Sequence, residues 1–206
     1  AKNNKQPTGV QPGHGVRLTA TARDCAQGNF QSTSNAMDMV IEGDGFFQIT
    51  MPDGTLAYTR NGAFKPDGNG NVVTSEGYLL EPAIQVPEGS TDFGVSRDGI
   101  VTITPAGQTT PQEIGQITIA RFINNAGLKS IGKNLYTETV ASGAPVVGNP
   151  GDNNSGTIVT NFVEMSNVQV VDEMVNMIVA QRAYEMNSKA VTTADSMLEV
   201  AAGLKR

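Results

Sequence analysis

Residues 171–202 read VDEMVNMIVAQRAYEMNSKAVTTADSMLEVAA, a run that contains neither Pro nor Gly. The absence of both helix breakers predicts one continuous helix, which would be about 48 Å long at the rise of an α-helix. Charged residues recur among its apolar ones, and the hydrocarbon core of a membrane would penalise them heavily. The run therefore predicts a long terminal helix that is not a membrane span.

The start of this helix carries its own signals. Ser166 precedes Gln169 by three residues, the spacing of a capping box, and Asp172 and Glu173 place negative charge near the positive end of the helix dipole. Gly and cationic residues follow the last apolar position, as they commonly do after a helix. We therefore assign 168–206 to a C-terminal helix that begins close to Ser166.

One row of apolar and small side chains follows the predicted helix. The row has eight members at spacings of four and three residues, and this eleven-residue rhythm keeps them aligned on a straight or slightly right-handed helix. Half of the row is Ala, whose small side chain lets a second helix approach closely. We therefore expect packing between subunits through the row and two flanking residues: Val175, Ile178, Val179, Ala183, Met186, Ala190, Ala194, Met197, Leu198 and Ala201.

Periodicity alone leaves a second interpretation open. The helix could fold back so that the row packs on the β strands of its own chain. Only one long helix is evident in the sequence, so the row has no helical mate of its own in this chain. We expect the mate to be another copy or a helix outside this chain, and cover by the chain's own sheet would contradict this expectation.

The region before the helix has a different pattern, in which short β-type runs alternate with turn signals. The pairs Asp53-Gly54, Asn61-Gly62, Glu76-Gly77 and Asp98-Gly99 separate such runs, and Asn, Asp and Gly tolerate the positive φ that tight hairpin turns require. The fold class we predict is mainly β with a long C-terminal α-helix, the β part being antiparallel and rich in hairpins. The expected strands are 46–50, 56–60, 71–74, 78–80, 93–96, 100–103 and 116–119.

The composition along the chain divides the rest into three parts. Residues 1–37 are rich in Gln, Asn, Thr, Ser and Gly and predict an extended connector, with one alternating patch at Val16–Ala20 that favours a strand. Residues 38–140 predict a β-rich outer domain. Residues 141–167 predict an irregular loop followed by a β-type return at 157–164.

Length and composition narrow the classes of function. The chain has 206 residues, a net charge of −6 and scattered Arg residues, which disfavours nucleic-acid binding. Its single Cys and single His cannot form an internal disulfide or a His-rich metal site. The chain opens at Ala1 without an initiator Met or a secretory signal, so we expect it to begin partway into a longer product.

The motifs that could carry chemistry are weak. Gly13-His14-Gly15 and Gly43-Asp44-Gly45 lack the third glycine of a dinucleotide fingerprint and indicate turns. The segment 67–71 begins like a calcium loop, but it lacks the required Gly and the final Glu, so it favours a hairpin turn. Cys25 with His14 is a formal nucleophile–base pair that we interpret as a bystander. We expect no catalytic, metal-binding or cofactor-binding residues and no enzyme activity.

Several segments, taken together, resemble the bacterial flagellar rod and hook family. They are IEGDGFFQI at 41–49, YTRNGAF at 58–64, 67–74 and VNMIVAQRAYEMNSKA at 175–190. PTGV at 7–10, GNF at 28–30, IGKNLY at 131–136 and SNV at 166–168 are most similar to distal rod members of that family rather than to its hook or proximal rod members. The likeness runs from Gln6 to the end of the chain.

The resemblance implies a structural axial component of the flagellar basal body. In that family an N-terminal helix, which would precede Ala1 here, pairs with the C-terminal helix to form the inner tube of a helical assembly. The implied function is a rigid distal rod that self-assembles and transmits motor torque to the hook, across the periplasm to the outer membrane. The implied partners are other copies, the proximal rod and hook proteins, the P-ring and L-ring proteins and the flagellar type III export apparatus.

The resemblance also suggests a role for the connectors, and three alternative functions remain open. We expect 1–37 and 141–167 to lie between subunits and to restrict bending. A hook or proximal-rod paralogue of the same family is the nearest alternative. A carbohydrate-binding surface module would instead need a pocket of converging polar and aromatic groups, and an enzyme would need Cys25 or His14.

Overall fold

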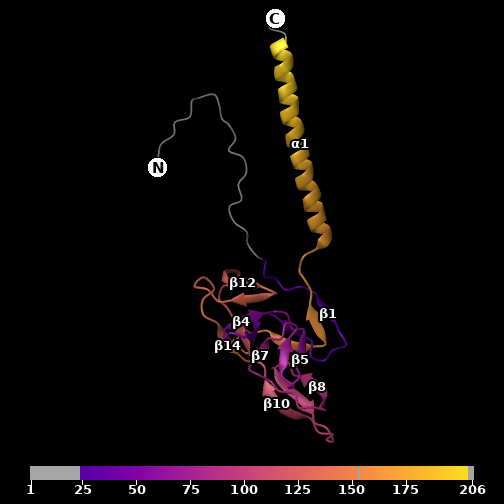
Figure 1. Cartoon of the computed structure of the whole chain (residues 1–206), viewed down its shortest axis with the longest axis vertical. Coiled ribbons are helices and arrows are strands. Elements are labelled where there is room, and N and C mark those ends of the chain that lie inside the picture. The colour runs from indigo at the N-terminus through magenta and orange to yellow at the C-terminus, as the bar shows by residue number, and fades with distance from the viewer. Residues whose placement is uncertain (1–23, 153, 204–206) are drawn as a thin grey trace.

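The computed structural model describes residues 24–152 and 154–203, so the expected strand at Val16–Ala20 and His14 lie outside the described residues. Strands occupy the chain from Phe30 to Glu164, and we call this part the β body. One helix, α1 (Val170–Gly203), follows it and projects away from one end of the β body (Figure 1). The predicted fold class is confirmed.

The largest sheet of the β body has nine strands, and every pair in it is antiparallel. Strand β3 (Phe46–Thr50) lies at its centre, because it pairs with β4 (Leu56–Thr59), β7 (Leu79–Glu81) and β11 (Ile119–Arg121), and β11 in turn pairs with β14 (Val146–Gly148) at the margin. Along the main path the order is β12 (Lys129–Gly132), β13 (Leu135–Thr137), β4 (Leu56–Thr59), β3 (Phe46–Thr50), β7 (Leu79–Glu81), β6 (Val72–Thr74) and β5 (Phe64–Pro66), with β11 (Ile119–Arg121) and β14 (Val146–Gly148) beside it.

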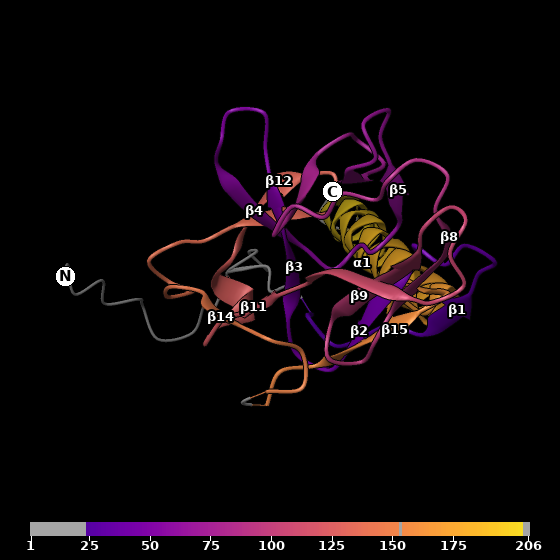
Figure 2. The ribbon, with the colours of Figure 1, turned by 90° about the horizontal axis from the view of Figure 1, so that it is seen from below.

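Three smaller antiparallel sheets complete the β body. Viewed along the long axis of the molecule, β11 and β14 lie on the side opposite β8 (Figure 2). A short 3₁₀ turn spans Asn125–Gly127. The small sheets are β8 (Thr91–Val95) with β9 (Ile100–Thr104) and β10 (Gln112–Gln116), then β2 (Met39–Glu42) with β15 (Thr157–Thr160), and β1 (Phe30–Ser32) with β16 (Phe162–Glu164).

The alternation of side chains along β3 supplies two separate cores. Successive strand residues point to opposite faces, so Phe46 and Phe47 enter different clusters. Phe47 packs edge-on against Phe64, with ring centroids 5.2 Å apart, in a cluster that also holds Ile119. Phe46 packs on the other face with Tyr58. The core is therefore built by the strands and by the loops that join them, and none of its clusters includes a residue of α1.

Most of the predicted hairpin turns are confirmed. Asp53-Gly54 joins β3 to β4, Glu76-Gly77 joins β6 to β7, and Asp98-Gly99 joins β8 to β9. Each of these three glycines has a positive φ, the conformation for which Gly is selected in tight turns.

The hairpin predicted at Asn61-Gly62 is wrong. The strands on either side do not pair with each other, because β4 pairs with β3 and β13 whereas β5 pairs with β6. Gly62 is required for a different reason: the amide of Met39 donates to its carbonyl at 3.0 Å, and a Cβ at Gly62 would lie only 1.7 Å from the carbonyl oxygen of Met39. This glycine therefore permits a close approach of two backbones.

Three further expectations need correction. The strand expected at 116–119 is interrupted, because the amide of Ile117 donates to Gly99 between the end of β10 and the start of β11. The β-type return divides into β15 and β16 at Asn161, which has a φ of 65°. The irregular loop predicted from residue 141 up to the β-type return is not irregular throughout, because it contains β14, whose backbone pairs with β11.

The capping-box prediction for the helix is also wrong. The Ser166 hydroxyl accepts a hydrogen bond from the amide of Val168 at 3.2 Å, which closes a local turn ahead of the helix. The helix begins only at Val170, and its first acidic residues are Asp172 and Glu173, as expected. Among the described residues, no helix has the length and apolar character needed to cross a membrane.

Candidate assembly surface

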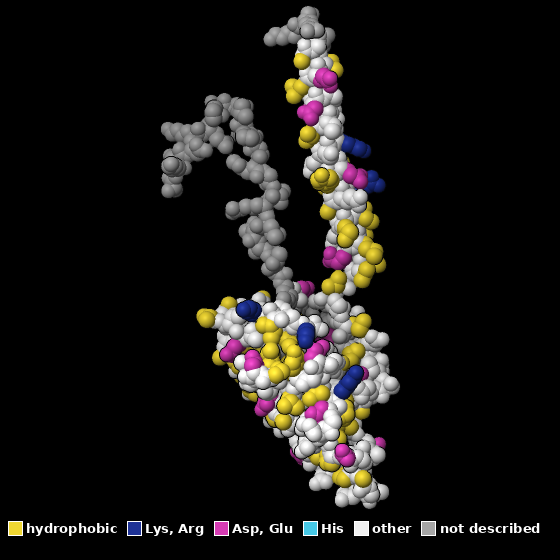
Figure 3. Space-filling view, viewed as in Figure 1, with side chains coloured by type: hydrophobic (Ala, Val, Ile, Leu, Met, Phe, Trp, Pro, Cys, Tyr) yellow, Lys and Arg dark blue, Asp and Glu magenta, His cyan; other side chains and the backbone are white. Residues whose placement is uncertain are grey.

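The helix α1 presents its whole circumference to solvent. None of its described residues is buried, and Val175, Val179 and Met186 are 52%, 62% and 66% exposed. Apolar side chains are visible along its length, with charged ones between them (Figure 3). The interpretation in which the helix folds back onto its own sheet is therefore wrong for the described part of the chain.

The predicted packing residues all lie on this one helix. Because side chains three and four residues apart share a face, the eight-residue row from Val175 to Ala201 forms a continuous apolar strip, called here the apolar row. The ion pair Arg182–Glu185 on the same helix, at 3.1 Å, is exposed to solvent and contributes only a few tenths of a kcal/mol. The apolar row thus has no cover among residues 24–152 and 154–203.

At the base of the helix, two chain segments lie side by side. The amide of Met165 donates to the carbonyl of Asn29 at 2.8 Å, and the side-chain amide of Asn167 donates to the carbonyl of Ala26 at 3.0 Å. The segment that enters the β body is thereby bonded to the segment that leaves it for α1. These two segments, 24–29 and 164–167, together with Arg60, are called the joint.

Arg60, just after β4, is the centre of the joint. Its Nε donates to an Oε2 of Glu164 at 2.9 Å, and the two side chains are 21% and 12% exposed. Its two terminal nitrogens donate to three backbone carbonyls at 2.9–3.1 Å, those of Ile41, Gly43 and Gly45. Each of the three nitrogens of the guanidinium therefore donates at least one hydrogen bond.

Glu164 links this arginine to the incoming segment. Its second oxygen accepts the amide of Gly28 at 2.9 Å, so one carboxylate holds Arg60 and the backbone of 24–29 together. A Cβ at Gly28 would lie 1.8 Å from the carbonyl oxygen of Met165, so only glycine allows the two segments to come this close. The joint is therefore a continuous network rather than a single ion pair.

The expected turn at Gly43-Asp44-Gly45 takes part in the same network. Gly43 and Gly45 have φ values of 109° and 148°, and this conformation directs their carbonyls at Arg60. The segment is a bend between β2 and β3, at the place where the sequence predicts a turn.

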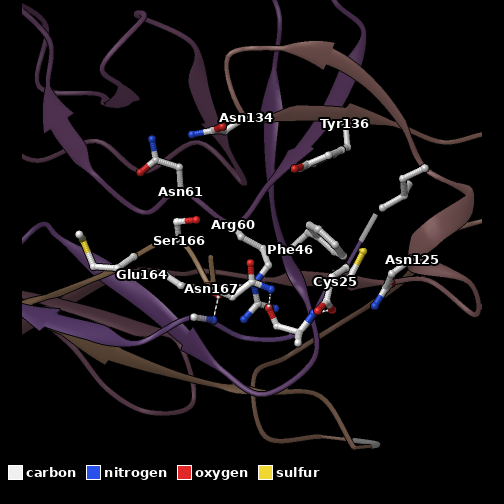
Figure 4. A pocket seen from close by; sticks show the side chains of 15 residues that line it. Cys25, Phe46, Arg60, Asn61, Asn125, Asn134, Tyr136, Glu164, Ser166 and Asn167 are labelled. Atoms are coloured by element: carbon white, nitrogen blue, oxygen red, sulfur yellow. Dashed lines mark hydrogen bonds and ion pairs between the residues drawn. The ribbon is translucent and has the colours of Figure 1, made fainter. Parts of the chain in front are cut away.

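A cavity of about 380 Å³ opens beside the joint. Figure 4 shows Cys25, Phe46 and Arg60 in its lining, together with Tyr136 and several side-chain amides. Phe46 is 5% exposed, so its ring belongs to the core and offers no open stacking face of the kind that the carbohydrate-binding interpretation needs. Cys25 is an exposed free thiol, and no group of three or more potential metal ligands occurs among the described residues.

Three groups elsewhere in the β body have shifted pKa values, and each shift has a structural explanation. A side-chain hydrogen bond from Thr55 is the main cause that holds the pKa of Asp53 below its ordinary value of 3.8. Burial raises the pKa of the Tyr58 hydroxyl, with a smaller contribution from the negative charge of Glu138. A hydrogen bond from the backbone amide of Asn71, followed by one from Asn69, holds the pKa of Asp67 below its ordinary value of 3.8. Asp67 thus closes the β5–β6 hairpin turn, which is the interpretation favoured over a calcium loop.

Sequence reasoning did not find the joint. Arg60 and Glu164 are 104 residues apart, and neither lies in a motif whose spacing indicates an ion pair. Their neighbours Thr59 and Val163 are ordinary strand residues. Only the return of β16 to the edge of the β body brings the two side chains together.

A β body that carries one long helix with an uncovered apolar row defines a class of protein: a structural subunit with a helix surface available to another chain. Comparison with known proteins places the chain more narrowly. Residues 40–103 match the family model described as the flagellar hook protein FlgE/F/G D1 domain, and residues 159–204 match that of the flagellar basal body rod FlgEFG protein C-terminal region.

Individual relatives agree with these matches. Flagellar basal-body rod protein FlgG of Borreliella burgdorferi is 50% identical over 207 residues, covering 100% of this chain and 78% of that protein. FlgG of Buchnera aphidicola, from Acyrthosiphon pisum, is 48% identical over 193 residues, covering 94% and 74%. Flagellar hook protein FlgE of Escherichia coli is 36% identical over 140 residues, covering 67% and 33%. The chain belongs to the family of flagellar basal-body rod proteins.

Proposed function

We propose that this chain is a structural, non-enzymatic component of the distal rod, where copies assemble into a rigid helical tube that transmits motor torque to the hook. The apolar row of α1 carries this proposal, because its Val and Met side chains are each more than half exposed in the single chain and a second helix packed on the row would bury them. Nearly full-length similarity to FlgG proteins, which is greater than the similarity to a hook protein, supports the rod over the hook.

The proposal includes a location and partners. Rod subunits of this kind would lie in the basal body from the periplasm to the outer membrane. They would contact the proximal rod, the hook and the P-ring and L-ring proteins, after export by the flagellar type III apparatus. Contacts that join unlike surfaces of successive copies generate an open helix instead of a closed ring, and this is the geometry that a rod requires.

A double substitution in the apolar row tests the proposal. Ala183→Asp with Ala190→Asp places two charges in the row, where a packed helix–helix contact would bury them without partners. We expect the purified chain to keep its folded β body and cells that carry the variant to form no distal rods, as seen by electron microscopy of isolated basal bodies.

The matched control uses the opposite side of the same helix. Gln181→Asp with Ser188→Asp introduces the same two charges at the same seven-residue spacing, about half a helical turn away from the row. We expect normal rods from this control. Normal rods from the Ala183 and Ala190 variant would show that the apolar row is not the packing surface.

A further inference from the structure

We propose that Arg60 and Glu164 are positioning residues that fix the direction in which α1 leaves the β body. The helix has no buried residue of its own, so contacts along its length do not set this direction. Whatever sets it must act through the short segment between Glu164 and Val170.

The joint provides such a constraint. On one side, Arg60 is anchored to the β body through the carbonyls of Ile41, Gly43 and Gly45. On the other side, it holds Glu164, the last residue of the strand that leads to the helix. A planar guanidinium that makes four hydrogen bonds fixes orientation in a way that a single point charge does not.

The carboxylate extends the constraint to a second chain segment. Glu164 also accepts the amide of Gly28, and beyond it Asn167 donates to Ala26. With the bond from the amide of Met165 to the carbonyl of Asn29, the segment that leads into α1 is bonded at three points to a neighbouring segment, and Glu164 links both segments to Arg60. The two segments form a double connection, which resists bending and twisting better than one extended chain.

The small solvent exposure of the pair favours a role in orientation over one in stability. In a largely buried ion pair, the attraction between the two charges is nearly offset by the free energy needed to remove them from water, so the net stabilisation is small. The geometry of the pair still restricts the conformations of the two chain segments that it joins. The inference rests on the proposed function in one respect: a rod whose subunits carry torque needs each helix held at one angle to its β body.

Distance measurements between two spin labels on the full chain test the proposal. One label replaces Lys189 on α1 and the other replaces Ser130 on β12, both exposed positions, in a Cys25→Ser background that removes the native thiol. For the chain with the joint intact we expect one narrow distribution of label-to-label distances.

Two substitutions loosen the joint to different degrees. Glu164→Gln leaves the three carbonyl bonds of Arg60 in place but provides only one acceptor oxygen for Arg60 and Gly28. Arg60→Lys replaces the planar guanidinium, with its several fixed donors, by a single ammonium group that cannot reproduce the same set of hydrogen bonds. We expect both variants to lose the single narrow distance peak, while the near-ultraviolet circular dichroism of the β body persists. If Arg60→Lys fails to fold, Glu164→Gln alone decides the question.

The exposed pair on the helix supplies the control. Glu185→Gln removes the partner of Arg182, whose side chain is 74% exposed, and should leave the narrow peak unchanged. A narrow peak that survives in Glu164→Gln would overturn the positioning role, as would a broad distribution in the intact chain. Because these measurements use the unassembled chain, their result tests the positioning role independently of the proposed function, which is tested by rod formation.

Discussion

At the scale of single residues, glycines in this chain have two distinct uses. Gly54, Gly77 and Gly99 adopt a positive φ in hairpin turns, and the sequence signals this use through a preceding acidic residue. Gly62 and Gly28 have no such conformational need and instead lie against another backbone. The sequence does not reveal the second use, because Asn61-Gly62 carries the turn signal of a hairpin and Gly28 follows an ordinary polar residue.

Gly62 provides the clearest residue-scale prediction. Gly62→Ala would place a Cβ 1.7 Å from the carbonyl oxygen of Met39, a backbone atom that cannot rotate away. We expect it to lower the free energy of unfolding by about 3 kcal/mol or more, measured by urea denaturation. Gly68→Ala is the control, because a Cβ at Gly68 would have no neighbouring atom within 4 Å and the change should stay within about 0.5 kcal/mol. Equal effects at both glycines would refute the close-approach role.

At the scale of elements, the β5–β6 hairpin depends on a charged side chain in its turn. Asp67 accepts the amides of Asn69 and Asn71 at 2.8 Å each, bonds that favour the ionised carboxylate and lower its pKa. A lowered pKa in the folded chain contributes stability above the ordinary value of 3.8, and this contribution disappears as the pH falls through the folded-state value.

The pH dependence of this hairpin can be measured against an uncharged isostere. Asp67→Asn keeps the shape and the acceptor oxygen but does not titrate in this range. We expect the wild-type chain to have the higher urea midpoint near neutral pH, and the gap to narrow as the pH falls below 3.8. A gap that is the same at both pH values would mean that the carboxylate charge does not stabilise the turn.

The helix α1 is an element of a different kind, because its stability does not come from burial in its own chain. Residues with high helix propensity, such as Ala, Met, Glu and Lys, occupy many of its positions, and no Pro or Gly interrupts it before Gly203. The strands show the opposite balance: most are three to five residues long and depend on their neighbours in the sheet.

At the scale of the whole molecule, the part of the chain that the structure describes joins the β body to α1 only through the short segment that follows Glu164. Since no residue of α1 contributes to any core cluster, we expect the β body to fold without it. A chain that ends at Gln169 should keep its free energy of unfolding within about 0.5 kcal/mol, measured by urea denaturation with near-ultraviolet circular dichroism as the signal.

A longer truncation is the matched control for this experiment. Ending the chain at Pro150 also removes β15, and with it Ile158, which is 1% exposed in the main core cluster. Loss of so large a buried aliphatic side chain, and of the strand that carries it, should abolish cooperative unfolding. A fall in stability on removing α1 alone would show that the helix has contacts with the β body that matter.

The sequence by itself determined the long helix, its apolar row, the antiparallel hairpins at Asp53, Glu76 and Asp98, and the family. These features depend on local patterns: periodicity, breaker residues and turn chemistry, each of which acts over a few neighbouring positions. Only the tertiary structure decided the joint, the close approach at Gly62 and the division of the return strand at Asn161. Each of these features depends on contact between segments far apart along the chain. A local sequence pattern does not indicate which distant backbone or side chain lies against a given residue.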